Sequence, residues 1–168
     1  MMDGKILVAY GTAAGSTAEV AQAIGEEIEK AGTLVDVRPV EEIKSLEGYD
    51  ALILGSAVRA FHLLIKTRKF IRKFRRQIKD MPAAYFIVCL TVMDPTPENI
   101  ETAKKFASPM LKIKEPIHLG LFAGCMDPDK ITDPFGKIMK GQPKKDYRDW
   151  EQIRAWGRET LEKLNNSI

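Results

Sequence analysis

The chain has 168 residues, 45% of them apolar, which suits one domain with a sizeable core and is short for two. Two cysteines make neither a disulfide framework nor a metal-binding spacing, and no apolar run is long enough to cross a bilayer. The formal net charge of +3 is small but unevenly distributed, and the first strand candidate begins too early to leave room for a signal peptide. We therefore expect a single domain over residues 1–168, reduced and cytoplasmic, with no metal site.

The first strand candidate, Ile6–Tyr10, runs into a loop of small and hydroxylated residues before a helix begins near Thr17. In a parallel α/β domain such a loop can surround an anion with backbone N–H groups, with the positive end of the helix behind it. It is not a Walker loop, because it has no lysine, and it does not match the dinucleotide turn, because only Gly11 and Gly15 are present. The loop therefore predicts a site for one phosphate monoester held by uncharged donors, and FMN is the commonest ligand of that kind on this architecture. The predicted donors are the hydroxyls and N–H groups of Thr12, Ala13, Ala14, Gly15, Ser16 and Thr17.

Continuous apolar runs alternate with helical patterns along the chain. Such runs are typical of strands that are covered on both faces in a parallel sheet. The strand candidates are Ile6–Tyr10, a more exposed Leu34–Val37, Ala51–Leu54, Ala83–Leu90 and Ile117–Ala123. The helix candidates are Thr17–Ala31, Leu63–Ile78, Pro97–Met110 and a last helix that is capped by Asp149 and carries Trp150 and Trp156 toward the sheet. Strands and helices alternate through five rounds, and right-handed crossovers between the strands then predict a doubly wound α/β fold.

The loops that follow the third and fourth strands, 55–62 and 91–95, should face the same site as the first loop. In an open parallel sheet, ligands lie beyond the carboxyl ends of the strands, where the strand order reverses. We expect these loops to hold the flat ring of the cofactor between them, with Phe61 or Met93 as a flat or polarizable contact. The predicted ring-binding residues are Ser56, Ala57, Val58, Arg59, Phe61, Leu90, Thr91, Val92 and Met93.

The segment from Lys66 to Lys79 carries eight basic residues and no acidic one. Without it, 18 basic residues face 23 acidic ones, so the rest of the chain is net negative. A charge run is by default a solvated face, but this one exceeds what solubility requires. It could dock an acidic redox partner or make a peripheral contact with an anionic membrane. We expect no nucleic acid, because no base-reading motif or stacking aromatic accompanies the charge.

Residues 125–148 form an insert before the last helix that is too long for an ordinary connection. Asp133 followed by Pro134 is a helix cap with a first-turn proline, which predicts a short helix over 135–140. Connections of this length are usually functional or disordered, and we expect this one to form a lip over a substrate.

The first loop resembles the phosphate loop of the flavodoxin family, which has Ser or Thr, any residue, Thr, Gly, a polar residue and Thr. Thr12, Gly15, Ser16 and Thr17 fit that pattern, whereas Ala14 stands where a hydroxyl is usual. The resemblance extends over the whole chain in topology. It implies a flavodoxin-like three-layer sandwich, a five-stranded parallel sheet in the order 2-1-3-4-5, and FMN as the cofactor.

Three further segments are similar to the flavodoxin-type quinone-dependent protoporphyrinogen IX dehydrogenases. They are 55–59, 81–86 and 149–153, and the insert is another point of similarity. Those enzymes are richer in aromatic residues around the second flavin loop and in the insert. The resemblance implies an FMN-dependent oxidoreductase that passes electrons from an organic donor, such as a porphyrinogen in porphyrin biosynthesis, to a quinone or similar acceptor.

Two alternatives stay open: a one-electron carrier of flavodoxin type, and a non-catalytic binding module with a degraded flavin site. No catalytic side chain is assigned, since the chemistry would belong to the flavin; Arg59 and His62 are the candidates that could assist it. Positive charge at Arg59 and in the basic segment would stabilise the reduced flavin. It therefore predicts a less negative potential than that of low-potential flavodoxins.

Overall fold

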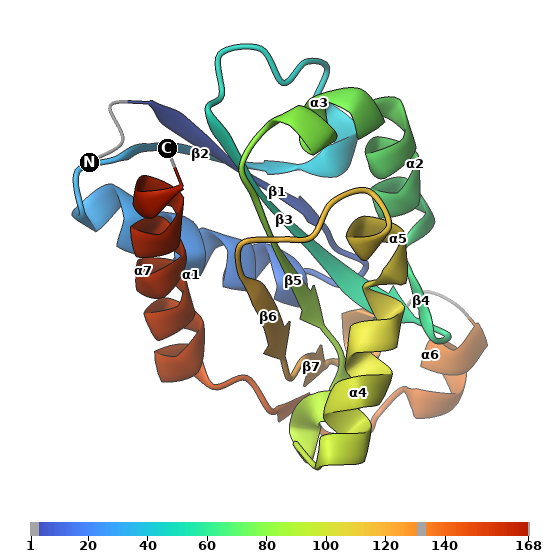
Figure 1. Ribbon diagram of the computed structural model, residues 1–168. Helices are drawn as coiled ribbons and strands as arrows, with labels where there is room; N and C mark the ends of the chain where they lie inside the picture. Colours follow the sequence, from blue (N-terminus) through green and yellow to red (C-terminus); the bar gives the residue numbers. More distant parts are fainter. Residues whose placement is uncertain (1–3, 131–133, 168) are drawn as a thin grey trace.

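The computed structural model describes residues 4–130 and 134–167 and folds them around a parallel sheet with helices on both faces (Figure 1). The five parallel strands are β1 (Lys5–Gly11), β2 (Leu34–Pro39), β3 (Ala51–Arg59), β5 (Ala83–Val88) and β6 (Leu119–Phe122). They lie in the order β2-β1-β3-β5-β6, and the two-residue strand β4 (His62–Leu63) pairs antiparallel with β3. With β4 set aside, this is the predicted order 2-1-3-4-5, which is confirmed.

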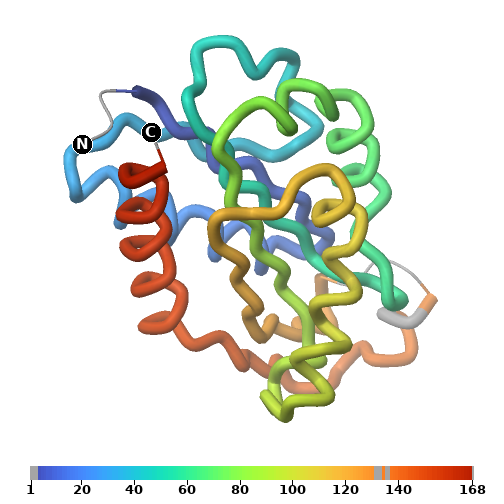
Figure 2. Tube along the Cα trace, viewed as in Figure 1, coloured from blue at the N-terminus to red at the C-terminus, as the bar shows by residue number. Residues whose placement is uncertain are grey.

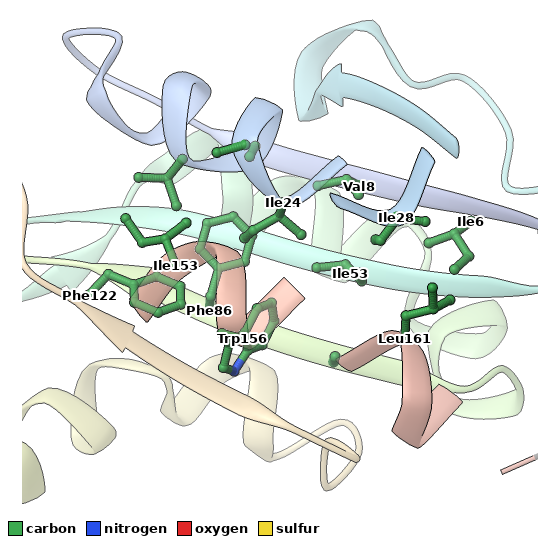
Figure 3. Close-up of a cluster of buried hydrophobic side chains, with 14 of the residues drawn as sticks. Ile6, Val8, Ile24, Ile28, Ile53, Phe86, Phe122, Ile153, Trp156 and Leu161 are labelled. Atoms are coloured by element: carbon green, nitrogen blue, oxygen red, sulfur yellow. The ribbon is translucent and has the colours of Figure 1, made fainter. Parts of the chain in front are cut away.

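Two helices cover one face of the sheet and four cover the other. Helices α1 (Ser16–Lys30) and α7 (Trp150–Asn166) pack on the face that carries Ile6, Val8 and Phe86 (Figure 3). The opposite face, with Leu7 and Leu52, is covered by α2 (Ile65–Lys73), α3 (Arg75–Asp80), α4 (Pro97–Phe106) and α5 (Ser108–Leu111). Because successive strand residues point to opposite faces and both faces are covered, the strands are apolar throughout.

The predicted helix over 63–78 is two helices, α2 and α3, with Phe74 between them. The break is slight, because the N–H of Phe74 still donates to the Phe70 carbonyl (3.0 Å) and that of Ile78 to the Phe74 carbonyl (2.9 Å). The predicted helix over 97–110 also divides, into α4 and α5. Pro109 lacks the N–H that would bond to the carbonyl four residues earlier, so the hydrogen bonding of α4 does not continue and Pro109 lies in the first turn of α5.

The predicted strand boundaries are wrong by one or two residues at one or both ends of β1, β2, β5 and β6, and by five residues at the carboxyl end of β3. β3 does not end at Leu54 but continues to Arg59, because 55–57 pair with 86–88 of β5. Gly55 permits this pairing, since a Cβ there would lie 1.9 Å from the ring of Phe86. β5 stops at Val88 and is followed by the 3-10 turn η2 (Leu90–Met93).

The last helix begins as predicted. Asp149 caps it by accepting a hydrogen bond from the N–H of Gln152 at 3.0 Å. Trp156 is buried against Phe86 and Phe122, and Trp150 packs against the same cluster. In the described residues, no helix combines the length and the apolar character needed to cross a bilayer.

The insert runs along the carboxyl-terminal end of the sheet, from β6 back to α7 (Figure 2). Two short antiparallel strands, β7 (Cys125–Met126) and β8 (Lys145–Asp146), close it at its base. Between them lie the 3-10 turn η3 (Pro128–Lys130) and α6 (Pro134–Met139), which confirms the predicted short helix. The predicted cap, Asp133, lies outside the described residues.

Candidate cofactor site

A cavity of about 610 Å³ opens at the carboxyl end of the sheet and is called the cofactor cavity below. Three of the segments that line it were predicted from the sequence: the turn after β1, the β3–β4 hairpin, and the end of β5. The fourth segment, 124–127, follows β6 and enters the insert. The lining residues are Ala13, Ala14, Ser16, Ala57, Val58, Arg59, Ala60, Phe61, Val88, Cys89, Leu90, Gly124, Cys125, Met126 and Asp127.

The turn Thr12–Thr17, called the phosphate loop below, has the geometry of an anion cradle. Gly15 immediately precedes α1 with φ of +92°, a left-handed conformation that costs glycine little, and its N–H donates to the Thr12 hydroxyl at 2.9 Å. The first N–H groups of α1 have no carbonyl partner within the helix and point out of its positive end. Thr17 is fully buried, and its hydroxyl has no hydrogen-bond partner among the described residues. A buried hydroxyl without a partner at the start of a helix suits a bound anion.

A buried pair of hydroxyls, from Ser56 in β3 and Thr67 in α2, lies next to Gly11 at the end of β1. Ser56 and Thr67 are both fully buried, and their oxygens lie 2.8 Å apart. The Ser56 hydroxyl also donates to the Ala57 carbonyl at 2.9 Å. A Cβ on Gly11 would lie 2.0 Å from the Thr67 hydroxyl, so β1 can approach this pair only through glycine. Ser56 therefore joins β3 to α2 beneath the cavity and is not among the residues that line it.

The β3–β4 hairpin carries the most strained backbone of the described residues. Arg59 pairs with His62 across a two-residue turn in which Ala60 and Phe61 have φ of 48° and 65°. Positive φ at both positions is the type I′ pattern, which favours Asn-Gly. For residues with a side chain it costs about 1–2 kcal/mol each. The turn holds Phe61 77% exposed at the rim of the cavity, with its ring centre 6.2 Å from that of Phe106.

Arg148, which was not among the predicted site residues, ties the insert to the phosphate loop. Its side chain is only 4% exposed, and it donates to both carboxylate oxygens of Asp146 (2.8 and 2.7 Å) and to the Ser16 carbonyl (3.3 Å). It also bonds the carboxylate of Glu19 in the first turn of α1, and its guanidinium lies 4.6 Å from the ring centre of Trp150. These bonds lower the pKa of Asp146 to about 2 and raise the pKa of Arg148. The signal that could have found Arg148 is its place directly before the predicted cap of the last helix.

Some of the predicted ring contacts lie on the far side of η2. Leu90 lines the cofactor cavity, whereas Val92 and Met93 line a neighbouring cavity of about 620 Å³ between η2, β6 and α7. Thr91 is half-buried and lines neither cavity. His62, predicted as a candidate to assist the flavin, lines neither cavity and is exposed in β4.

Three further titratable residues lie near the two cavities: His118, Cys89 and Cys125. His118 precedes β6 and is not within the strand, as had been predicted; its Nδ1 lies 2.7 Å from the Thr160 hydroxyl and its ring stacks on Trp156. Burial lowers the pKa of His118. Burial also raises the pKa of Cys89 and Cys125, so neither thiol is activated as a nucleophile, although both lie at the cavity.

The residues of the cavity fit a flat cofactor with a phosphate tail. The phosphate loop offers N–H groups and hydroxyls without a cationic side chain, in agreement with the sequence. The walls beyond it are formed mainly by small and apolar side chains, which suit an aromatic ring. Gly124 to Asp127 complete the cavity because β6 lies beside β5 in the sheet and its carboxyl end opens at the same edge.

The fold and this cavity define an α/β domain with an open site at the point where the strand order of its parallel sheet reverses. The family model named "Flavodoxin domain" matches residues 7–139. The chain belongs to the flavodoxin family, and membership of this family implies a flavin cofactor.

Comparisons with individual proteins agree with the family. The chain is 28% identical to protoporphyrinogen IX dehydrogenase (quinone) of Escherichia coli strain K12, over 92% of this chain and 93% of that protein. A flavodoxin from the domain Archaea has the same fold, with a TM-score of 0.59, 19% identity and coverage of 96% of this chain and 99% of its own. A flavo di-iron protein from Thermotoga maritima matches with a TM-score of 0.62 and 17% identity, over 97% of this chain and 36% of its own.

Proposed function

We propose that this protein binds FMN, with the phosphate in the phosphate loop and the ring in the cofactor cavity. The observation that carries the proposal is the buried Thr17 hydroxyl, which has no partner among the described residues and stands at the start of α1. When bound, FMN would supply the capacity to accept and release electrons. The N–H groups of Ala13 and Ala14 and the hydroxyls of Thr12, Ser16 and Thr17 would hold the phosphate by uncharged donors, while the N–H of Gly15, also a predicted donor, bonds the Thr12 hydroxyl.

We further propose that the protein is an FMN-dependent oxidoreductase that passes electrons from an organic donor to a quinone. Support comes from the relation to a quinone-linked protoporphyrinogen IX dehydrogenase along 92% of the chain. The insert adds Met126 and Asp127 to the wall of the cavity, where they could contact a donor molecule. A porphyrinogen is the donor class that the relative suggests. The two free cysteines, Cys89 and Cys125, are consistent with work in the reducing cytoplasm.

The residues around the ring would tune its chemistry and exclude water. Arg59 lines the cavity, and its positive charge would stabilise negative charge on a reduced ring and raise the potential. Phe61 at the rim would cover an exposed ring edge by an apolar contact. No side chain of the cavity is assigned as an acid or base.

An absorbance spectrum of the purified protein, followed by anaerobic reductive titration, tests this proposal against its alternatives. We expect a yellow protein that accepts two electrons together and reduces a soluble quinone when protoporphyrinogen is supplied. Two separate one-electron stages without quinone turnover would instead favour a flavodoxin-type carrier. A colourless chain that does not bind added FMN would leave only the binding module. A very low reduction potential for the second electron would contradict the proposal that Arg59 stabilises the reduced flavin.

A further inference from the structure

Helices α2 and α3 present a continuous positively charged surface, called the basic face below. Its members are all exposed: Arg68, Lys69, Arg72, Lys73, Arg75, Arg76 and Lys79. The opposite side of the same helices is buried against the sheet through Phe70, Ile71, Phe74 and Ile78. The cations span about 17 Å of helix at 1.5 Å per residue.

The positive charges of the basic face are not balanced by carboxylates of the described residues. Within the part of the chain that the structure describes, none of its seven cations has a carboxylate oxygen within 4.0 Å. The eighth basic residue of the segment, Lys66, is half-buried and pairs with Glu41 at 2.9 Å. By contrast, Arg148, Arg154 and Arg158 around α7 all pair with carboxylates. The surface charge of α2 and α3 is therefore available to an external anion.

Two exposed apolar side chains lie at the end of the basic face that is nearest the cofactor cavity. Ile65, the first residue of α2, is 64% exposed and precedes Arg68, Lys69 and Arg72 by three, four and seven residues, so it lies on the same helix face. Phe61, 77% exposed, lies in the two-residue turn of the β3–β4 hairpin, which leads into α2; Figure 1 shows this hairpin beside α2. A charged face that ends in exposed apolar groups is typical of contact with the interface of a membrane.

We propose that the basic face docks on the anionic phospholipid surface of a membrane, with Ile65 and Phe61 entering the headgroup region. The proposal rests on the proposed function, because a quinone acceptor resides in the bilayer and docking would bring the cavity rim to it. A diffuse layer of phosphate charge suits cations spread along two helices without any matched geometry. An acidic protein would need carboxylates placed opposite individual cations, and a nucleic acid would gain nothing from an exposed isoleucine.

Sedimentation with lipid vesicles tests the proposal on the full chain, with and without added FMN. Vesicles of phosphatidylglycerol and phosphatidylcholine in equal parts are compared with vesicles of phosphatidylcholine alone. The variant R68Q/R72Q/R76Q removes three charges from the basic face. The matched control, K140Q/K144Q/K145Q, removes three charges from exposed positions of the insert. Ile65→Ser removes the apolar contact without a change of charge.

We expect the native chain to partition into anionic vesicles at least about tenfold better than into neutral ones, and to be released near 0.5 M salt. Partitioning into anionic vesicles should fall at least about tenfold in R68Q/R72Q/R76Q and several-fold in Ile65→Ser. It should fall less than about threefold in the control. Equal losses in the two charge variants, no preference for anionic vesicles, or tighter binding to a DNA duplex than to vesicles would overturn the proposal. A failure to bind FMN would affect the proposed function only, because sedimentation is measured independently of the flavin.

Discussion

At the scale of single residues, a comparison of two threonines distinguishes an effect on ligand binding from an effect on stability. Thr17 and Thr33 are both buried, and each has a hydroxyl without a partner among the described residues. Thr17 stands at the start of α1 beside the phosphate loop, whereas Thr33 follows the other end of that helix. A buried polar group without a partner opposes folding by about 1–3 kcal/mol, so each position needs a reason. For Thr17 the reason that we propose is an oxygen of a bound phosphate.

Thr17→Val should therefore weaken FMN binding by at least about tenfold, the loss expected for one hydrogen bond to a charged phosphate. It should also raise the stability of the protein without FMN, because an unpaired hydroxyl is replaced by a methyl group. Thr33→Val should raise stability in the same way and leave the affinity for FMN unchanged. Fluorescence titration with FMN and urea unfolding provide the two measurements. Unchanged affinity in Thr17→Val would contradict the placement of the phosphate.

At the scale of elements, one side chain joins the insert to the first helix. Arg148 follows β8, pairs with Asp146 in that strand, and reaches the Ser16 carbonyl and the Glu19 carboxylate in α1. Because Ser16 belongs to the phosphate loop, the position of the insert and the shape of the cradle depend on the same guanidinium. We therefore propose that Arg148 is a positioning residue for the phosphate loop.

Arg148→Met keeps the apolar stem but removes these bonds, and we expect it to weaken FMN binding by about tenfold, as loss of one positioning contact does. The loss of stability should be modest, about 1–3 kcal/mol, because Asp146 and Glu19 can reach solvent. Arg158→Met is the matched control, since Arg158 bonds Glu27 at the other end of α1. Equal affinity for FMN in the two variants would refute the positioning role.

At the scale of the whole molecule, acid stability depends on the packing of the first helix against the last. Glu27 of α1 accepts from Arg158 (2.8 Å) and Arg154 (3.2 Å) of α7 and from its neighbour Lys30 (2.8 Å). Bonds from Lys30 and Arg158 lower the pKa of Glu27 to about 2. Since the folded state holds the proton less tightly than the unfolded chain, this contribution is complete above the ordinary pKa of 4.5 and is lost as the pH falls toward 2.

Glu27→Gln should lower the urea midpoint at neutral pH, and its difference from the native chain should shrink steadily as the pH falls from 4.5 toward 2. The control is Glu29→Gln, an exposed position on the same helix. Unfolding followed by circular dichroism across this range gives the two curves. A difference that stays constant with pH would show that the carboxylate charge of Glu27 does not contribute.

Local sequence patterns predicted most elements of the fold. The apolar runs located all five parallel strands because strands covered on both faces contain few polar residues. Their ends were less well predicted, because Gly55 and its neighbours were interpreted as a loop although they pair with β5. Pro109 was present in the sequence, yet the apolar periodicity on either side of it concealed the break between α4 and α5.

The sequence by itself determined the small, hydroxylated loop after the first strand and the alternation of strands and helices, because both are local properties. The order of the sheet was predicted from the resemblance to the flavodoxin family, and the structure confirms it. Only the tertiary structure decided which residues share the cofactor cavity. It added Gly124 to Asp127 from the neighbouring strand and placed Val92 and Met93 in the adjacent cavity. It also joined Arg148 to Ser16 across 132 residues of sequence. Such contacts depend on how the chain returns to one edge of the sheet, and no local pattern encodes that return.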